Sequence, residues 1–153
     1  MVNRRILVAG FLLVTACGRG RSPAPAPLEQ AAAVPNVRLV ATLQPSGSPV
    51  TGQARLAPGR TGQEVQVTIS IQNSVVGLTH RWQILRGSCD SPIGTDIAPA
   101  SANAPLLVRA DGTAEASITL PITLPVDSDY HVSVLRSRTD DTVIACGSLD
   151  VER

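Results

Sequence analysis

The sequence predicts an all-β domain, an antiparallel sandwich or flattened barrel of roughly eight strands. From about residue 37 onward, apolar and polar residues alternate with a period of two through several short segments. Turn-forming residues separate these segments about every dozen residues. No stretch of about 11 residues or more shows convincing helical periodicity. The three observations together favour short strands with one face in a core and the other in solvent.

The expected strands can be placed in order along the chain. The clearest is the third, where the apolar residues at 65, 67, 69 and 71 alternate with polar ones. The full set of expected strands is 37–44, 50–56, 64–72, 81–86, 106–110, 113–120, 130–136 and 142–150. Gly, Pro, Asp and Ser residues mark turns between them at 46–47, 58–62, 111–112 and 127–129.

Charge and aromatic content restrict the classes of function. The chain has 153 residues, with 13 basic residues, all of them arginine, against 12 acidic ones. The formal net charge of +1 gives no field for nucleic acid or anionic lipid, so no nucleic-acid partner is expected. After the N-terminal segment, Trp82 and Tyr130 are the only aromatic residues, and an aliphatic core is predicted.

The first 17 residues have the pattern of an export signal. Arg4 and Arg5 precede an apolar stretch, Ile6 to Ala16, which is too short to span a membrane and ends at Cys17. The last four residues, Val14 to Cys17, resemble a bacterial lipobox, in which the cysteine becomes the lipidated first residue. The alternative is plain cleavage at a small residue, with Cys17 a bystander. Gly18 is not the Asp associated with retention in the inner membrane, which favours the outer membrane where a host has one.

These features predict three parts. Residues 1–16 form a lipoprotein signal peptide, and residues 17–36 form the lipidated Cys17 followed by a tether rich in Pro and Ala. Residues 37–153 form the β-sandwich domain. Acyl chains on Cys17, such as palmitate, would hold the domain at the membrane of the bacterial cell envelope. The folded domain is then expected in the periplasm or at the cell surface.

The number of cysteines is consistent with an exported protein. Three cysteines leave one odd residue in an exported protein, and lipidation of Cys17 would account for it. Cys89 and Cys146 then remain as a pair, for which an oxidising compartment favours a disulfide. The alternative reading is two free thiols as metal ligands, but no further cysteine or clustered histidine lies nearby.

Four segments resemble the copper/zinc superoxide dismutase-like domains and the related domains of chordin-like secreted proteins. They are Gly77 to Cys89, ending in Gly-Ser-Cys; Asp111 to Ala114, an Asp-Gly turn; Tyr130 to Ser137; and Ile144 to Leu149, with Ala-Cys-Gly. The similarity covers about residues 37–151. It implies an eight-stranded Greek-key sandwich in which the last cysteine bonds back to the earlier one.

The resemblance also implies where copper would bind, and the ligands are missing. The positions of the His-x-His motif are occupied by Gln83 and Leu85, and the third histidine is replaced by Leu135. Residues 90–105 contain no histidine, and Val143 stands where the family has its substrate-steering arginine. Leucine cannot coordinate copper. This chain is therefore expected to be a degenerate member without dismutase activity, in which Leu85 and Leu135 lie close together as a small apolar patch.

The remaining candidates have ordinary structural readings. His80 and His131 fall on opposite strand faces and are read as solvated histidines rather than metal ligands. Trp82, between Arg81 and Arg86, is a possible surface contact, or it packs at the sandwich edge with Arg81 stacked nearby. The aspartates lack the spacing of a calcium loop and suit turns; they are Asp127, Asp129, Asp140 and Asp141.

No motif for a nucleophile, a phosphate or a dinucleotide is present, so no catalytic residue, metal or cofactor is assigned. The first functional hypothesis is a non-catalytic, lipid-anchored envelope module that binds a protein or glycan partner or has a structural role. The alternative is a residual metal-binding or redox protein that handles copper or zinc. Active superoxide dismutation is the least favoured reading, because a fold does not carry activity without its site.

Overall fold

The computed structural model describes residues 37–91, 94–98, 103–124 and 129–152, and within these ranges all regular structure is β. The predicted all-β class is confirmed. The described residues belong to the second of two contact units, Ala33–Arg153. The signal peptide, residues 1–16, and the tether, residues 17–36, lie outside the described residues, as does Cys17. Among the described residues, no helix is long and apolar enough to cross a membrane.

Nine strands follow one another along the chain. They are β1 (Leu39–Pro45), β2 (Thr51–Pro58), β3 (Val65–Gln72), β4 (Thr79–Arg86), β5 (Leu106–Leu107), β6 (Ala114–Leu120), β7 (Tyr130–Leu135), β8 (Val143–Ser148) and β9 (Asp150–Val151). Seven of the eight expected segments correspond to one strand each, with ends that differ by a few residues. The eighth, 142–150, is divided between β8 and β9.

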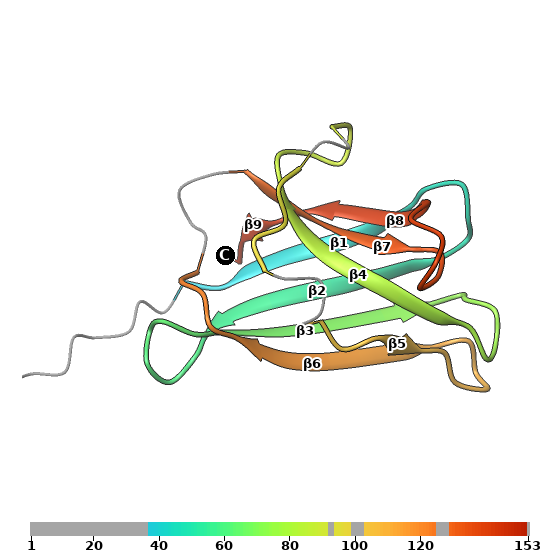
Figure 1. Ribbon diagram of the computed structural model, residues 1–153, viewed down its shortest axis with the longest axis horizontal. Helices are drawn as coiled ribbons and strands as arrows, with labels where there is room; N and C mark the ends of the chain where they lie inside the picture. Colours follow the sequence, from blue (N-terminus) through green and yellow to red (C-terminus); the bar gives the residue numbers. More distant parts are fainter. Residues whose placement is uncertain (1–36, 92–93, 99–102, 125–128, 153) are drawn as a thin grey trace, which may run out of the picture. The chain divides into compact units, whose positions relative to one another are not determined.

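The strands form an antiparallel sheet that nearly closes into a barrel, in the order β5-β4-β7-β8-β1-β2-β3-β6, while β9 pairs with β1. One layer contains β1, β2, β3 and β6, and β4 crosses diagonally in front of it (Figure 1). The chain leaves the first layer after β3, returns for β6, and then crosses back to β7. This is a Greek-key arrangement, since sequence neighbours are separated in the sheet.

The alternation seen in the sequence positions the core. On β3, the side chains of Val65, Val67, Ile69 and Ile71 are at most 2 % exposed, while the polar residues between them face outward. The same inward faces of the other strands complete a core dominated by Val, Leu, Ile and Ala. Trp82 and Tyr130 also belong to it, so the two aromatic residues contribute to an otherwise aliphatic interior.

The Asp-Gly turn between β5 and β6 shows how short polar residues end a strand. Gly112 has a φ of 78°, a backbone conformation that residues with a Cβ rarely adopt. The Oδ1 atom of Asp111 accepts hydrogen bonds from the Thr113 N–H at 3.0 Å and from its hydroxyl at 2.7 Å. These two bonds hold the pKa of the Asp111 carboxyl below its ordinary value, because they favour the charged form.

Two expected strands end early, each at the point where the chain changes its backbone partner. After Leu107, the Val108 N–H donates to the Leu78 carbonyl, and the Arg109 N–H donates to the Thr113 carbonyl. The chain therefore enters its turn before residue 110. At the other end, the Leu149 N–H donates to the Tyr130 carbonyl, and β9 then pairs with β1. The strand expected over 142–150 is thus interrupted at Leu149.

Candidate functional site

A cleft of about 540 Å³ lies on the outer face of β4, β7 and β8. It contains several of the positions that the sequence singled out, together with residues from the loops after β1 and β4. Its lining residues are Gln44, Pro45, Ser46, Gln83, Leu85, Cys89, Asp90, His131, Ser133, Asp141, Val143 and Cys146. The cleft is the candidate binding site because it joins buried polar groups with an open mouth.

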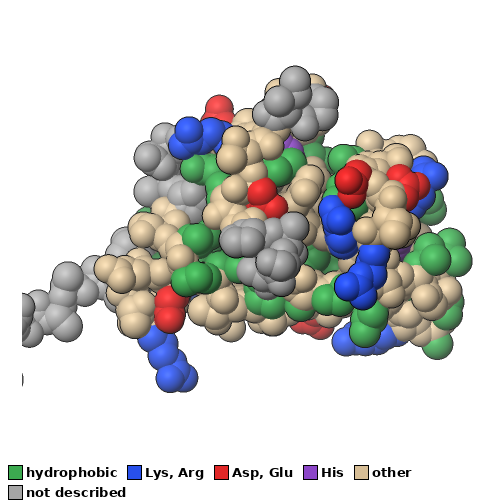
Figure 2. All heavy atoms as spheres, in the orientation of Figure 1, with side chains coloured by type: hydrophobic (Ala, Val, Ile, Leu, Met, Phe, Trp, Pro, Cys, Tyr) green, Lys and Arg blue, Asp and Glu red, His purple; other side chains and the backbone are tan. Residues whose placement is uncertain are grey.

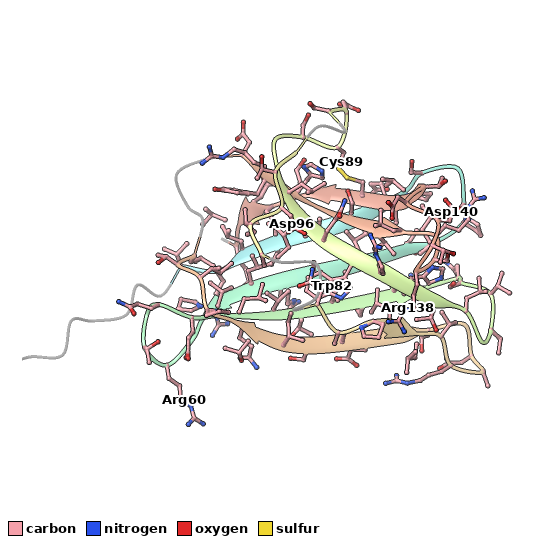
Figure 3. The ribbon with its side chains drawn as sticks, in the orientation of Figure 1. Arg60, Trp82, Cys89, Asp96, Arg138 and Asp140 are labelled. Atoms are coloured by element: carbon pink, nitrogen blue, oxygen red, sulfur yellow. A yellow bond between two sulfur atoms is a disulfide. The ribbon has the colours of Figure 1, made fainter. Side chains whose placement is uncertain are left out.

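The disulfide between Cys89 and Cys146 forms one side of this cleft, and its prediction is confirmed. It connects the loop after β4 to the middle of β8, across 57 residues of sequence (Figure 3). Cys146 is 8 % exposed, while Cys89 is exposed. The bond therefore fixes one wall of the cleft, a loop, to a central strand.

The floor of the cleft comes from the outward residues of two paired strands. Gln83 on β4 lies opposite Ser133 on β7, and Leu85 lies opposite His131. Ser133 also lies opposite Cys146 on β8, and its Oγ is 3.6 Å from the Cys146 Sγ. His131 and Ser133, two residues apart on β7, share a face by the period-two alternation of a strand, and both line the cleft.

His131 is not the solvated residue that the sequence led us to expect. Its side chain is 2 % exposed, and its Nδ1 is 2.9 Å from the Gly87 carbonyl oxygen. Because a carbonyl can only accept, Nδ1 carries the hydrogen, and Nε2 of the neutral ring is an acceptor. Among the described residues, Nε2 has no hydrogen-bond partner. An acceptor with no donor among the described residues thus lines the cleft.

His80 is buried as well, but on the inner face of β4, which confirms that the two histidines face opposite ways. Its Nε2 is 2.7 Å from the Ser74 Oγ, and its Nδ1 is 2.7 Å from the Arg136 carbonyl oxygen. The ring therefore connects the loop after β3 to the loop after β7. The expected surface exposure was wrong for both histidines, because a backbone carbonyl from a distant segment bonds the Nδ1 of each buried ring.

The expected apolar patch of Leu85 and Leu135 does not form. Leu135 lies opposite Arg81, whereas Leu85 lies opposite His131, four positions away along β7. That separation is about 13 Å at the usual rise per residue. Leu85 lies near the C-terminal end of β4, and Leu135 lies at the C-terminal end of β7. Because the two strands are antiparallel, these two residues are at opposite ends of the strand pair. Leu85 lines the cleft, and Leu135 is buried elsewhere on β7.

Of the possible surface contacts, Trp82 is in the core. It is 2 % exposed, and its Nε1 donates a 2.8 Å hydrogen bond to the Ala104 carbonyl. Its inward position follows from the alternation of β4. Arg81 faces outward and bonds Asp141 at 2.9 Å, rather than stacking on the tryptophan. Arg86 lies over the Tyr130 ring, 5.8 Å from its centroid.

The aspartates near the loop after β7 have local partners. Asp140 accepts a 2.9 Å hydrogen bond from the Thr142 N–H and lies 3.7 Å from the Arg136 Nε. Hydrogen bonds from Thr142 hold the pKa of the Asp140 carboxyl below its ordinary value. Figure 2 shows acidic and basic side chains gathered in the region where Figure 3 labels Arg138 and Asp140. Asp127 lies outside the described residues.

Metal ligands are not grouped in the part of the chain that the structure describes. No three His, Cys, Asp or Glu residues there are placed so that they could hold one ion. The positions that would carry copper by resemblance, Gln83 and Leu85, line the cleft, and Leu135 does not. Comparison with models of protein families and with curated proteins finds no match to this chain.

Two residues of the cleft, Asp90 and Gln44, were missed by the sequence reasoning. Asp90 follows the disulfide cysteine in a loop, and Gln44 lies opposite Cys146 at the end of β1. Neither belongs to a motif, and only the pairing of β1 with β8 brings Gln44 beside Cys146. No signal in the sequence could have found it.

Asp96 lies in a segment that extends the edge of β4, where it pairs with Leu85 (Figure 3). Burial raises the pKa of its carboxyl, because removal from water disfavours the charged form. Hydrogen bonds with the backbone of Ala98 and Ile84 lower it by less. The folded protein therefore holds this proton more tightly than the unfolded chain does. The resulting stability is fully present below about pH 4 and is lost as pH rises through the raised pKa.

Asp96→Asn is expected to remove the loss of stability with rising pH, because an amide does not ionise. The amide keeps the Oδ1 acceptor for the Ala98 N–H. We expect the Tm of the variant, relative to that of the unsubstituted chain, to rise between about pH 3.5 and pH 7. Thermal unfolding followed by circular dichroism at each pH measures the difference. Glu115→Gln, at an exposed carboxylate on β6, is the matched control. A relative Tm that falls with increasing pH would contradict the assignment.

Proposed function

We propose that this chain is a non-catalytic, lipid-anchored module of the bacterial cell envelope that binds a partner through the cleft on β4, β7 and β8. The observation that carries the proposal is the Cys89–Cys146 disulfide. It accounts for two of the three cysteines and leaves Cys17, at the end of the apolar N-terminal stretch, for the lipid. A disulfide also suits the oxidising side of a membrane.

The cleft supports binding rather than catalysis. Its polar groups come from three strands and three loops, and a disulfide holds its wall in place. His131 and Ser133 both lie in the cleft, but the His131 Nδ1 is bonded to the Gly87 carbonyl. Within the described part of the chain, the Ser133 hydroxyl contacts only the Cys146 sulfur atom. A serine nucleophile needs a base within hydrogen-bond reach, and the two side chains make no such bond here.

We also propose that the domain is a degenerate member of the copper/zinc superoxide dismutase-like family. The eight-strand Greek-key order and the bond between the Gly-Ser-Cys and Ala-Cys-Gly segments agree with what the resemblance implies. The envelope location then follows from the signal, with the outer membrane favoured in a host that has one. The domain is expected in the periplasm or at the cell surface.

Lipid attachment is tested directly at Cys17. In cells fed a tagged palmitate, we expect the unsubstituted chain to carry the label and to sediment with membranes after a high-salt wash. Cys17→Ser is expected to abolish both the label and the sedimentation, because the thiol that accepts the lipid is gone. The matched control is Cys89→Ala with Cys146→Ala, which leaves Cys17 intact. Label that persists in Cys17→Ser would contradict the anchor.

One observation favours metal handling as a second candidate function. His131, whose Nε2 has no partner within the described ranges, and the carboxylate of Asp90 line the same cleft, and both are ligands that suit copper or zinc. The metal content of the full chain after copper and zinc loading and desalting, with dismutase activity measured on the same sample, decides this candidate. Stoichiometric metal without activity would replace the binding module by a metal-handling role.

A further inference from the structure

Three hydrogen-bond acceptors lie side by side on the floor of the cleft. They are the Nε2 of His131, the Oγ of Ser133 and the amide oxygen of Gln83. Gln83 lies directly opposite Ser133, and His131 lies two residues from Ser133 on the same face of β7. Of these, Nε2 belongs to a side chain that is 2 % exposed and has no partner among the described residues. It is not among the fully buried atoms without a partner, so a donor from a ligand in the cleft can reach it.

The charges around the floor are acidic. Asp90 and Asp141 line the cleft, and no lysine or arginine is among its lining residues. Asp141 is already bonded to Arg81, which leaves the exposed Asp90 as the unbalanced charge. The site therefore offers acceptors and a negative charge, and the ligand that fits is a cation that donates hydrogen bonds.

The walls add an apolar component. Pro45, Leu85 and Val143 line the cleft together with the disulfide. Methylene groups can pack on such walls while a polar head reaches the floor, in the way that lysine stems lie on apolar surface. A metal ion fits less well, because no three ligating residues are grouped in the described part of the chain. An ammonium group has three donors and can use neutral oxygen and nitrogen acceptors.

We propose that the cleft binds a primary alkylammonium group, with the nitrogen over His131, Ser133 and Gln83 and the alkyl chain against Leu85 and Val143. This inference rests on the proposed binding function and names the ligand of the same site. The chain itself contains no lysine, so it cannot supply this group from its own side chains. The amine comes from a free diamine or from a lysine-like side chain of a partner.

The test titrates the purified full chain with cadaverine and with Nα-acetyl-lysine methylamide, using calorimetry. We expect saturable binding with a Kd of about 1 mM or tighter for at least one of them. Tighter binding of cadaverine indicates a free diamine, and tighter binding of the lysine derivative indicates a partner side chain. Two comparison ligands define the chemistry. 1,5-Pentanediol lacks the charge. Nα-acetyl-Nε-trimethyl-lysine methylamide, called trimethyl-lysine below, lacks the ammonium N–H donors. Both are expected to bind at least about tenfold more weakly.

Substitutions locate the site. Ser133→Ala and Gln83→Met each remove one acceptor and are expected to weaken amine binding about five- to tenfold. Asp90→Asn, in an exposed loop, is expected to weaken it about threefold. Gln66→Met and Glu115→Gln, on the outer faces of β3 and β6, are the matched controls and should leave the Kd unchanged.

The proposal is overturned if neither amine shows binding at a concentration about ten times the expected Kd. It is equally overturned if trimethyl-lysine binds as well as lysine, or if the cleft variants behave like the controls. Its failure is separable from that of the proposed function. The lipid anchor is measured by labelling at Cys17, and a chain that is anchored but does not bind amines would retain its place in the envelope with another ligand.

Discussion

Replacing both Cys89 and Cys146 by alanine is expected to lower the free energy of unfolding by about 4 kcal/mol. The bond closes a loop of 57 residues, and the loss of that constraint enlarges the conformational freedom of the unfolded chain. For a domain of this size, the Tm should fall by more than about 10 °C. Urea unfolding followed by far-ultraviolet circular dichroism measures both quantities.

The control for this prediction is reduction of the bond in the unsubstituted chain. With a strong reductant, its stability should fall toward that of the double variant, while the double variant should not respond. A double variant that unfolds within about 1 kcal/mol of the oxidised chain would show that the disulfide contributes little to the fold.

Trp82→Ala is expected to lower the free energy of unfolding by a similar amount, about 3–5 kcal/mol. The indole is 2 % exposed, so its removal leaves a large cavity between the layers. It also leaves the Ala104 carbonyl without the Nε1 donor. The measurement is again urea unfolding by circular dichroism, since the variant lacks the only tryptophan of the chain.

Trp82→Phe separates packing from hydrogen bonding. The phenyl ring fills much of the space but cannot donate to Ala104, and we expect a smaller loss than for alanine. Tryptophan fluorescence of the unsubstituted chain provides a second check, because a buried indole emits at shorter wavelength than a solvated one. An alanine variant as stable as the unsubstituted chain would contradict the burial of Trp82.

The strands could be predicted from the sequence wherever alternation was long and regular. On β3, four buried aliphatic residues alternate with polar ones, and both the strand and its inward face were predicted correctly. The disulfide followed from cysteine counting. The end of the final strand could not be predicted, because the bond from Leu149 to the Tyr130 carbonyl depends on where β7 lies.

The site was predicted less completely, because it depends on register and on loops that return from far along the chain. Period-two spacing placed His131 and Ser133 on one face, but it could not pair Leu85 with His131 rather than with Leu135. Local sequence also gave no sign that the carbonyls of Gly87 and Arg136 would bury the two histidines. Side-chain patterns do not indicate backbone hydrogen-bond partners, and such partners determine the environment of both histidine rings.

The position of β8 between β7 and β1 also determines when the domain can fold. The strand that fills the middle of the sheet comes from residues 143–148, and it pairs with β1 near Gln44. Until those residues are available, β1 and β7 each have an open edge, and Cys89 has no Cys146 to join. Such distant pairings make folding slow. Strand insertion and disulfide formation therefore become one late event, which waits until almost the whole chain is available.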